Sequence, residues 1–533
     1  MPFRLSCTRR LAALALTLTL TLAAAGARAE TPATGGTLFA VVQPEPTVLT
    51  STVNTQYPNG VVSVNVFDGL VTYDESMTPR PSLAERWEVA ADGLSVTFHL
   101  RPGVRWHDGQ PFTSADVRYS VMEVWKKVHA RNRVTFADVQ DVETPDPLTA
   151  VFRLRQPAPV ILSALNAQEG QILPRHLYEG TDVLTNPHNQ KPVGTGAFRF
   201  KAWKKGEYIE LERNPDYWDQ GKPYLDRLIF RIIPDAGVRA AALELGDVMY
   251  APYDAVPLSD VERLRAHKDL AIETRGYDWQ SQYLFLEFNL RNPVLANLKV
   301  RQAIAHAIDR GKLVDVVWHG IGKAATGPVP SSLGRTYTAD VPAYPYDTAK
   351  AEALLDEAGY PRGAGGVRFT LHQDYQPFND NFRQNAEFIR QSLKRVGIEV
   401  AVRSQDLATF VRRVYGDYDF DLNSGQFSVF MDPQMGLVRQ YWSKAISRGT
   451  PWTNGSGYAN PEMDRLIEGA MRETDAGRRA GLFQDLQRLA MTDLPVLPLS
   501  ELWHFTVYNR RLRGLETSPD AALASLKNVW IER

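Results

Sequence analysis

The sequence predicts an α/β protein of at least two domains, and three observations support this prediction. Residues 367–402 read as a strand, an amphipathic helix and a second strand, which is the βαβ unit of a parallel sheet. Alternating apolar residues elsewhere predict further strands, some of them antiparallel. The chain has 533 residues, whereas a single hydrophobic core stops growing near roughly 250 to 300 residues.

Residues 1–29 have the pattern of a signal peptide. Three arginines precede an apolar run from Leu11 to Ala25, and Ala27-Arg28-Ala29 forms a cleavage pattern of small residues. The apolar run is shorter than the roughly 20 residues that span a bilayer. We therefore expect export with cleavage near Ala29/Glu30. The pair Arg9-Arg10 leaves twin-arginine export open beside the general route.

Composition excludes several classes of function for the mature chain. The one cysteine is Cys7, inside the predicted signal peptide, so the mature protein has no disulfide, thiolate nucleophile or cysteine-bound metal. Without the four arginines of residues 1–29, the 60 basic and 61 acidic side chains become 56 and 61, a net charge of −5. This balance argues against nucleic acid as a partner.

The first part of the mature chain is predicted to mix strands and helices. Residues 38–42 read as a buried strand. The alternation in Leu94–Leu100 predicts another strand, and Pro102-Gly103 is expected to turn the chain into a short partner strand through Trp106, forming a β-hairpin. Thr113–Asp116 fits a capping box, so a helix is expected to follow.

The middle of the chain continues the mixed pattern, with strands predicted at 197–200, 209–211 and 228–232. These strands are expected to form an antiparallel section. Asp235 is a typical helix N-cap, and the helix that follows carries Val238, Ala242 and Leu245 before it ends at Gly246.

The last third contains the clearest unit, a βαβ crossover of strand 367–371, helix 382–396 and strand 398–402. Such crossovers are right-handed. Two helices at 461–473 and 476–491 precede an apolar segment, 494–499, that is predicted to return as a strand. No repeat or low-complexity linker separates these parts, so short hinges are expected to join the domains.

The sequence contains no motif that predicts catalysis, a metal or a cofactor. Gly455-Ser456-Gly457 lies in a Gly- and Asn-rich loop and is read as a tight turn, and Gly320–Lys323 lacks the spacing of a phosphate loop. No two histidines have the spacing of a helical zinc site. The chain has 61 acidic residues, and any two of them could form a catalytic carboxylate pair in space. An exported hydrolase with an unrecognised carboxylate pair is therefore kept as an alternative.

Three predicted strand ends favour a binding crevice instead. They are Gln43–Pro46, His372–Phe378 and Gly425–Phe430, and they carry aromatic or polar residues where loops usually have turn formers. Ligand crevices of α/β sheets open at the carboxyl ends of strands. Packing in the core is the alternative interpretation for each aromatic residue.

Several blocks of the sequence have the order and spacing of a known family. They are Phe67-Asp68-Gly69-Leu70-Val71, Leu83-Ala84-Glu85-Arg86-Trp87, Trp106-His107-Asp108-Gly109-Gln110-Pro111-Phe112, Pro192-Val193-Gly194-Thr195-Gly196 and Arg213-Asn214-Pro215-Asp216-Tyr217-Trp218. On these blocks the chain resembles the periplasmic dipeptide, oligopeptide and nickel-binding proteins, which are family 5 of the ABC transporter solute-binding proteins. The resemblance covers essentially the whole mature chain.

The resemblance implies an α/β, two-lobed periplasmic-binding-protein fold (Venus flytrap) with an additional accessory domain. The expected ranges are 1–29 for the signal peptide, 30–69, 191–275 and 500–533 for lobe I, 70–190 for the accessory domain and 276–499 for lobe II. It also implies a periplasmic monomer that closes on a peptide-like or other small solute and docks on an ABC permease in the inner membrane. A ligand sensor or chaperone on the same fold is the other alternative.

One position departs from the pattern of the family's peptide-binding members, which place an aspartate about three residues before an Asp-Pro pair. That aspartate pairs with the α-ammonium group of the peptide. Here Val429 stands at this position before Asp432-Pro433, and a valine cannot form the ion pair. Glu169, in the Asn166–Gly170 segment, is a candidate for a replacement carboxylate.

The predicted ligand-binding residues are aromatic or polar side chains near the strand ends and the expected lobe crossing. They are Tyr57, Glu169, Tyr277, Trp279, Gln426, Phe427, Phe430 and Trp442.

Overall fold

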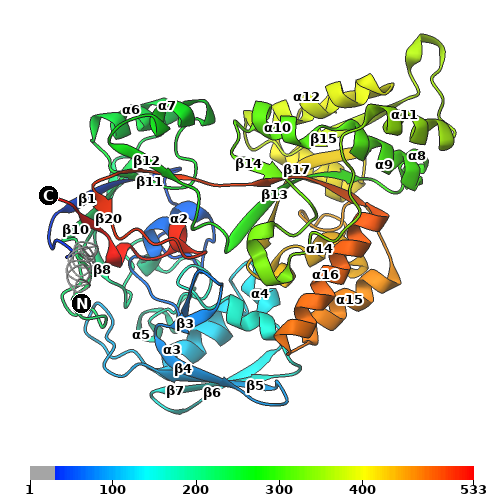
Figure 1. The fold of residues 1–533 in the computed structure, drawn as a ribbon. Helices are drawn as coiled ribbons and strands as arrows, with labels where there is room; N and C mark the ends of the chain where they lie inside the picture. The colour runs from blue at the N-terminus through cyan, green and yellow to red at the C-terminus, as the bar shows by residue number, and fades with distance from the viewer. Residues whose placement is uncertain (1–30) are drawn as a thin grey trace, which may run out of the picture.

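The computed structural model describes residues 31–533, so the predicted signal peptide lies outside the described residues. The first lobe is built on a seven-stranded sheet of order β12-β19-β11-β1-β10-β9-β8 (Figure 1). Its strands are β1 (Thr37–Val42), β8 (Phe198–Lys204), β9 (Tyr208–Arg213), β10 (Arg227–Ile232), β11 (Tyr250–Ala251), β12 (Leu270–Glu273) and β19 (Thr506–Asn509). The predicted antiparallel section is confirmed in β8, β9 and β10.

The second lobe is built on a six-stranded sheet of order β14-β18-β13-β17-β15-β16. Its strands are β13 (Gln280–Phe288), β14 (Gly322–Ala324), β15 (Phe369–Tyr375), β16 (Ile398–Arg403), β17 (Leu422–Phe430) and β18 (Val496–Leu502). The predicted βαβ unit is confirmed, because β15 and β16 pair in parallel and α12 (Asp380–Arg395) connects them. The strand expected at 494–499 corresponds to β18.

Helices cover both faces of this second sheet. One face packs on α9 (Leu298–Ala307), α10 (Arg310–Val317), α11 (Thr348–Glu357) and α12, and the other on α14 (Val438–Tyr441), α15 (Pro461–Arg472) and α16 (Ala476–Asp493). β13 lies in the middle of this sheet and has eight of its nine residues buried. Among residues 31–533, no helix combines the length and the apolar character that crossing a bilayer requires.

The accessory unit is built on a third sheet, of order β4-β5-β7-β6. Its strands are β4 (Ala84–Val89), β5 (Ser95–Leu100), β6 (Val139–Asp146) and β7 (Thr149–Leu154), and its helices are α3 (Ser114–Tyr119), the π-helix η1 (Ser120–Trp125) and α4 (Asn132–Thr135). We include the segment after β7, up to residue 178, in this unit. The capping box at Thr113 and Asp116 is confirmed.

The predicted hairpin between Leu94–Leu100 and a strand through Trp106 is wrong. β5 pairs with β4 and β7 instead, and only an isolated bridge joins Arg105 to Pro111. Pro111 has no N–H to donate to a ladder, and Trp106 fills the core with only 2% of its surface exposed. The pattern that resembled a short strand is therefore a turn with a buried aromatic side chain.

Helix α6 (Ala236–Leu245) begins and ends where the sequence predicted, but its buried face is different. Asp235 accepts a hydrogen bond from the N–H of Val238, and Gly246 adopts φ 79° at the C-cap. Val238 and Leu245 are 55% and 77% exposed. Local residue preferences determine the ends of a helix, whereas its neighbours in space determine which face is buried.

The predicted loop at Gly425–Phe430 is a strand. β17 pairs with β13 along all nine of its residues, from Leu422 to Phe430, and β15 likewise continues to Tyr375. Gly425 breaks the apolar pattern because the Gln376 side chain lies 2.2 Å from the position that a Cβ would occupy there. The sequence suggested a turn at Gly425, whereas the glycine is required there because the Gln376 side chain approaches the backbone closely.

Two chain segments, 274–279 and 503–505, cross between the seven-stranded and six-stranded sheets. The C-terminal segment ends beside β1 of the first lobe, and its strand β20 (Leu512–Arg513) pairs with β21 (Trp530–Ile531) (Figure 1). The domain boundaries given above stay a prediction. Each of the three larger sheets nevertheless draws its strands from a different set of chain segments.

Glu287 on β13 is a buried carboxyl group in the core of the second lobe. Its Oε1 accepts a hydrogen bond from the backbone N–H of Ser456 at 2.9 Å, and its Oε2 accepts one from Asn423 Nδ2 at 2.8 Å. These donors do not offset the loss of water, so burial raises the pKa of Glu287 from 4.5 to about 7.

We predict that Glu287 makes the protein less stable as the pH rises. The folded state keeps this proton after the unfolded chain has released it, so stability is lost between pH 4.5 and about 7, by about 3 kcal/mol. In Glu287→Gln the side chain stays neutral at every pH. The melting temperature of the variant, relative to that of the wild type, should therefore rise as the pH increases across this range. Glu462→Gln, at an exposed position, serves as the control, and melting curves of Glu287→Gln that run parallel to the wild type would contradict the prediction.

Candidate functional site

Arg131, just before α4, is the point where three parts of the chain meet. Its Nε donates to Glu169 Oε1 at 2.8 Å, and its Nη2 donates to the other oxygen of the same carboxylate. Its Nη1 donates to Thr55 Oγ1 at 3.1 Å, and its Cζ lies 5.0 Å from the ring centre of Phe430 on β17. One guanidinium group therefore contacts the segment before α2 (Tyr57–Ser63), the accessory unit and the second lobe.

Glu169 is a fully buried partner of Arg131. Burial alone would raise the pKa of its carboxyl group, but the charges of Arg131 and His129 outweigh burial, so the pKa is lowered. The backbone N–H of Glu169 donates a hydrogen bond to Asn166 Oδ1 at 3.0 Å. The carboxylate that the sequence suggested for a solute is thus occupied by an arginine of the same unit.

Two of the predicted residues, Tyr57 and Tyr277, belong to an aromatic cluster of the first lobe. Tyr57 stacks on Tyr253 with 4.6 Å between ring centres, and Tyr253 contacts the edge of Tyr277 at 4.9 Å. His504 also packs on this cluster. Burial, together with the carboxylate of Asp254, raises the pKa of Tyr57 to about 12, so this hydroxyl stays neutral and can donate a hydrogen bond.

Trp279 and Phe430 lie where the second lobe meets the accessory unit. The two rings meet edge to face at 5.4 Å, and Trp279 Nε1 donates to the Ser163 carbonyl oxygen at 3.1 Å. Both side chains are buried, with 1% and 2% of their surface exposed. Phe430 lies beneath the Arg131 guanidinium, and Trp279 supports Phe430 from the side.

The backbone groups of β17 beyond the end of β15 are already in contact with other parts of the chain. The Gln376 side chain donates to the Gln426 carbonyl oxygen at 3.1 Å and accepts from the Gln426 N–H at 2.8 Å. Gly436 approaches the Ser428 carbonyl oxygen so closely that a Cβ at Gly436 would lie 2.2 Å from it. A solute at this edge therefore meets side chains rather than free backbone groups.

Arg439 on α14 is a second guanidinium at the same end of β17. Its Cζ lies 5.0 Å from the ring centre of Phe427, which itself packs on Tyr283 and Phe285. Burial and the nearby charge of Arg131 lower the pKa of Arg439 to about 10. Arg131 and Arg439 are therefore close enough for their positive charges to repel one another.

Trp442, the last predicted residue, lies apart from this group. It follows α14 and packs on the core formed by α15 and α16, and Lys444 Nζ lies 5.6 Å from its ring centre. Trp442 therefore packs on the helical side of the second lobe.

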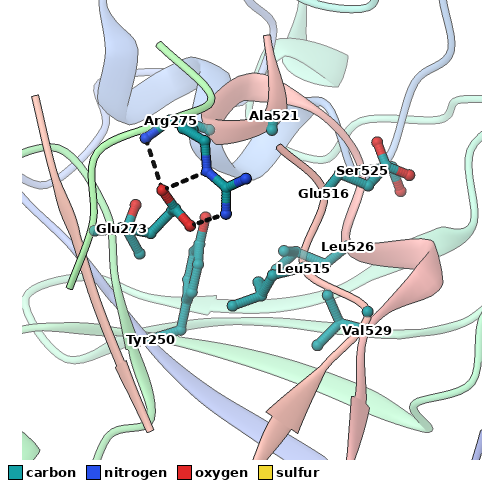
Figure 2. Close-up of a pocket in the computed structure, with 12 residues that line it drawn as sticks. Tyr250, Glu273, Arg275, Leu515, Glu516, Ala521, Ser525, Leu526 and Val529 are labelled. Carbon is teal, nitrogen blue, oxygen red and sulfur yellow. Dashed lines mark hydrogen bonds and ion pairs between the residues drawn. The ribbon is translucent and has the colours of Figure 1, made fainter. Parts of the chain in front are cut away.

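Cavities differ in whether they can hold a solute. Figure 2 shows a cavity of about 30 Å³ in the first lobe, beside the ion pair of Arg275 and Glu273. This volume equals the share of about one water molecule. A cavity of about 650 Å³ lies between the accessory unit and the second lobe, from Leu162 and Ser163 to Met431 at the end of β17, and ligand sites usually measure roughly 300 to 1,000 Å³. The boundary between these two parts thus leaves room for a solute beyond the end of β17, although neither Arg131 nor Phe430 lines this cavity.

The structure brings together part of the predicted set. Glu169 and Phe430 contact Arg131, and Trp279 packs on Phe430. Gln426 and Phe427 lie on the adjoining stretch of β17, whereas Tyr57 and Tyr277 belong to the separate first-lobe cluster. Sequence reasoning missed both arginines, because charged residues in short polar segments are usually solvated. For Arg439 the available signal was its place in the apolar run Met435–Trp442.

The described residues offer no metal centre: within 31–533, no three His, Cys, Asp or Glu side chains are grouped to hold a metal ion. The site is composed of arginines, aromatic rings and amides. Such groups bind and orient a small molecule by hydrogen bonds and stacking.

Comparison with known proteins identifies relatives along the whole chain. Residues 78–447 match the model of the bacterial extracellular solute-binding proteins, family 5 Middle. The oligopeptide-binding protein AppA of Bacillus subtilis is 28% identical, over 95% of this chain and 93% of AppA. The glutathione-binding protein GsiB of Pectobacterium atrosepticum is 27% identical, over 86% and 87%. The crystal structure of NikZ from Campylobacter jejuni in complex with Ni(L-His) superposes with a TM-score of 0.75 at 27% identity, over 90% and 96%.

These matches confirm the resemblance drawn from the sequence blocks and the two-lobed fold that it implied. The relatives are binding proteins rather than enzymes.

We predict that the ion pair between Arg131 and Glu169 stabilises the protein strongly. Glu169→Gln leaves a largely buried guanidinium without its counter-charge, which should destabilise the fold by about 3 kcal/mol and lower the melting temperature. Glu462→Gln removes the exposed partner of Arg465 and should cost less than about 1 kcal/mol. Equal melting temperatures for the two variants would show that the buried pair contributes no more than a surface pair.

Proposed function

The chain belongs to the bacterial extracellular solute-binding proteins of family 5, and from this premise we propose that it captures its solute around Arg131 and the end of β17. The protein is the solute-binding component of an ABC importer. It holds a peptide-like or other small solute between its lobes outside the cytoplasm and delivers it to a membrane permease.

One observation carries the proposed place of capture. The segment before α2, the accessory unit and the second lobe converge on the Arg131 guanidinium, which touches Thr55, Glu169 and Phe430. A solute that enters here contacts parts of the chain that move relative to one another when the hinge opens. Binding energy gained in the closed form only is what drives closure.

The relatives' names set the range of solutes for this site: an oligopeptide, glutathione and a nickel–histidine complex. All three carry amino-acid groups, so we propose an amino-acid-derived solute here. A dissociation constant near 1 µM needs about −8 kcal/mol, which a few buried aromatic contacts and one desolvated charge pair supply.

The remaining features of the proposal follow from capture without chemistry. We infer that residues 1–29 direct export and are removed near Ala29/Glu30, and that the mature protein is a periplasmic monomer without enzymatic activity. Its closed form docks on the permease in the inner membrane, and nucleic acid is not a partner.

We predict that protein purified from the periplasm retains a small molecule at one copy per chain. Mass spectrometry of the intact complex should show one adduct, and denaturation should release it unchanged. Addition of the released fraction to stripped protein should reduce the radius of gyration in small-angle X-ray scattering. Conversion of the solute during incubation would contradict this prediction in favour of an enzyme, and an unchanged radius would contradict capture between moving lobes.

A further inference from the structure

A small cavity lies beside the two chain segments that cross from one lobe to the other. Its lining includes Tyr277 and Asp278 of the first crossing, His504 of the second crossing, and Gln282 and Glu501 of the second-lobe sheet. The cavity measures about 20 Å³, and roughly 10 to 15 Å³ is enough for one water-sized molecule. The hinge therefore contains space for a single small molecule and is far too small for a solute.

Two of the lining side chains have a buried polar atom that needs a partner. The Nε2 atom of His504 and the Oε1 atom of Gln282 are shielded from solvent, and neither makes a hydrogen bond within residues 31–533. Gln282 as a whole is only 8% exposed. Buried polar atoms of folded proteins are nearly always hydrogen-bonded. Because both residues line the same cavity, one molecule bound there serves both atoms.

The other nitrogen of the His504 ring determines which hydrogen bond Nε2 can make. Nδ1 lies 2.5 Å from Oδ2 of Asp254, and the backbone N–H of Phe505 donates to Oδ1 of the same carboxylate at 2.9 Å. A carboxylate only accepts hydrogen bonds, so Nδ1 carries the hydrogen and Nε2 of the neutral ring is an acceptor. The amide oxygen of Gln282 is an acceptor too, so the molecule that serves both atoms must have two donors.

We propose that this cavity binds one molecule with a single heavy atom, water or ammonium, which donates one hydrogen bond to His504 Nε2 and another to Gln282 Oε1. The bound molecule completes a relay from Asp254 of the first lobe, through His504 of the second crossing, to Gln282 on β13 of the second lobe. Water and ammonium share the required donor chemistry, and the carboxyl groups of Asp278 and Glu501 beside the cavity also suit a cation. This site is separate from the place of solute capture and does not depend on it.

The relay acts on the hinge because its two ends belong to different lobes. The hydroxyl groups of Tyr277 and Thr506 already join the two crossings on the side of the first lobe, at 2.5 Å. The bound molecule joins the second crossing to β13 on the side of the second lobe. Local opening of the crossings breaks this connection, so the relay should protect the backbone amides of residues 274–279 and 503–505 from hydrogen exchange.

The first test is a crystal structure of the full mature chain, at a resolution that shows ordered water, with a second crystal soaked in thallium(I) acetate. We expect one density peak at about 2.7 to 3.2 Å from both His504 Nε2 and Gln282 Oε1. Thallium(I) replaces ammonium and gives a strong anomalous signal, so an anomalous peak at this place identifies ammonium, whereas an unchanged peak identifies water. A cavity without density, or a direct hydrogen bond between the two side chains, would overturn the proposal.

The second test measures the relay by hydrogen exchange and mass spectrometry of the wild type, Gln282→Leu and Gln384→Leu. Leucine has about the size of glutamine but no acceptor. Gln384 is the matched control, because it is an exposed glutamine of the same lobe whose side chain donates to Asp380. We expect peptides that cover 274–279 and 503–505 to exchange about fivefold faster in Gln282→Leu, since loss of one hydrogen bond shifts a local opening equilibrium by about this factor.

Gln384→Leu should exchange like the wild type in both crossings. Equal exchange of the crossings in all three proteins would show that the bound molecule does not connect the lobes, and it would overturn the relay. The crystal structure of the wild type needs no variant, so it decides whether the site exists even if Gln282→Leu folds poorly. Neither test uses the captured solute, so the proposed function stands or falls separately.

Discussion

The two lobes are connected by two short chain segments, 274–279 and 503–505, and this connection governs how the rest of the molecule works. The second-lobe sheet is packed on both faces, and packed cores deform little, so changes of shape are expected to concentrate in the few residues of the crossings. The Tyr277 hydroxyl lies 2.5 Å from Thr506 Oγ1, which ties the two crossings together at the first lobe. A hinge held in this way allows the lobes to open and close without loss of either core.

A hinge of this kind makes the contacts between the lobes decisive, and these contacts combine apolar packing with polar groups. Residues 31–533 contain no cysteine, so no disulfide joins these lobes. Instead, the Arg131 guanidinium and the Trp279 indole reach across the boundaries by hydrogen bonds and ring contacts. Groups that lose water on closure must find partners in the closed form, because an unpaired buried polar group costs about 1 to 3 kcal/mol.

The parts of the fold that local patterns determine could be predicted from the sequence. The βαβ unit of β15, α12 and β16 follows from periodicity alone, and the ends of α6 follow from Asp235 and Gly246. Contacts between distant segments could not be predicted. Gly425 was read as a turn signal because nothing local announces that Gln376 packs against it.

The same limit applies to the site. Glu169 and Phe430 were identified by residue type, yet their roles depend on Arg131, which lies 38 residues from Glu169 in the chain. Whether an arginine is paired is a property of the folded molecule. A sequence shows only that the chain has nearly equal numbers of acids and bases, whereas the structure shows which of them lacks a partner.

The pairing of Arg131 links the accessory unit to the position of the second lobe. Arg131 is held by the carboxylate of Glu169 and lies over the ring of Phe430 on β17. The contact with Phe430 is made only where the accessory unit and the second lobe meet, so it stabilises this arrangement over one in which the two separate. A solute that adds further contacts across the same boundary shifts the populations in the same direction, because the difference in affinity between the two forms is the quantity that sets them.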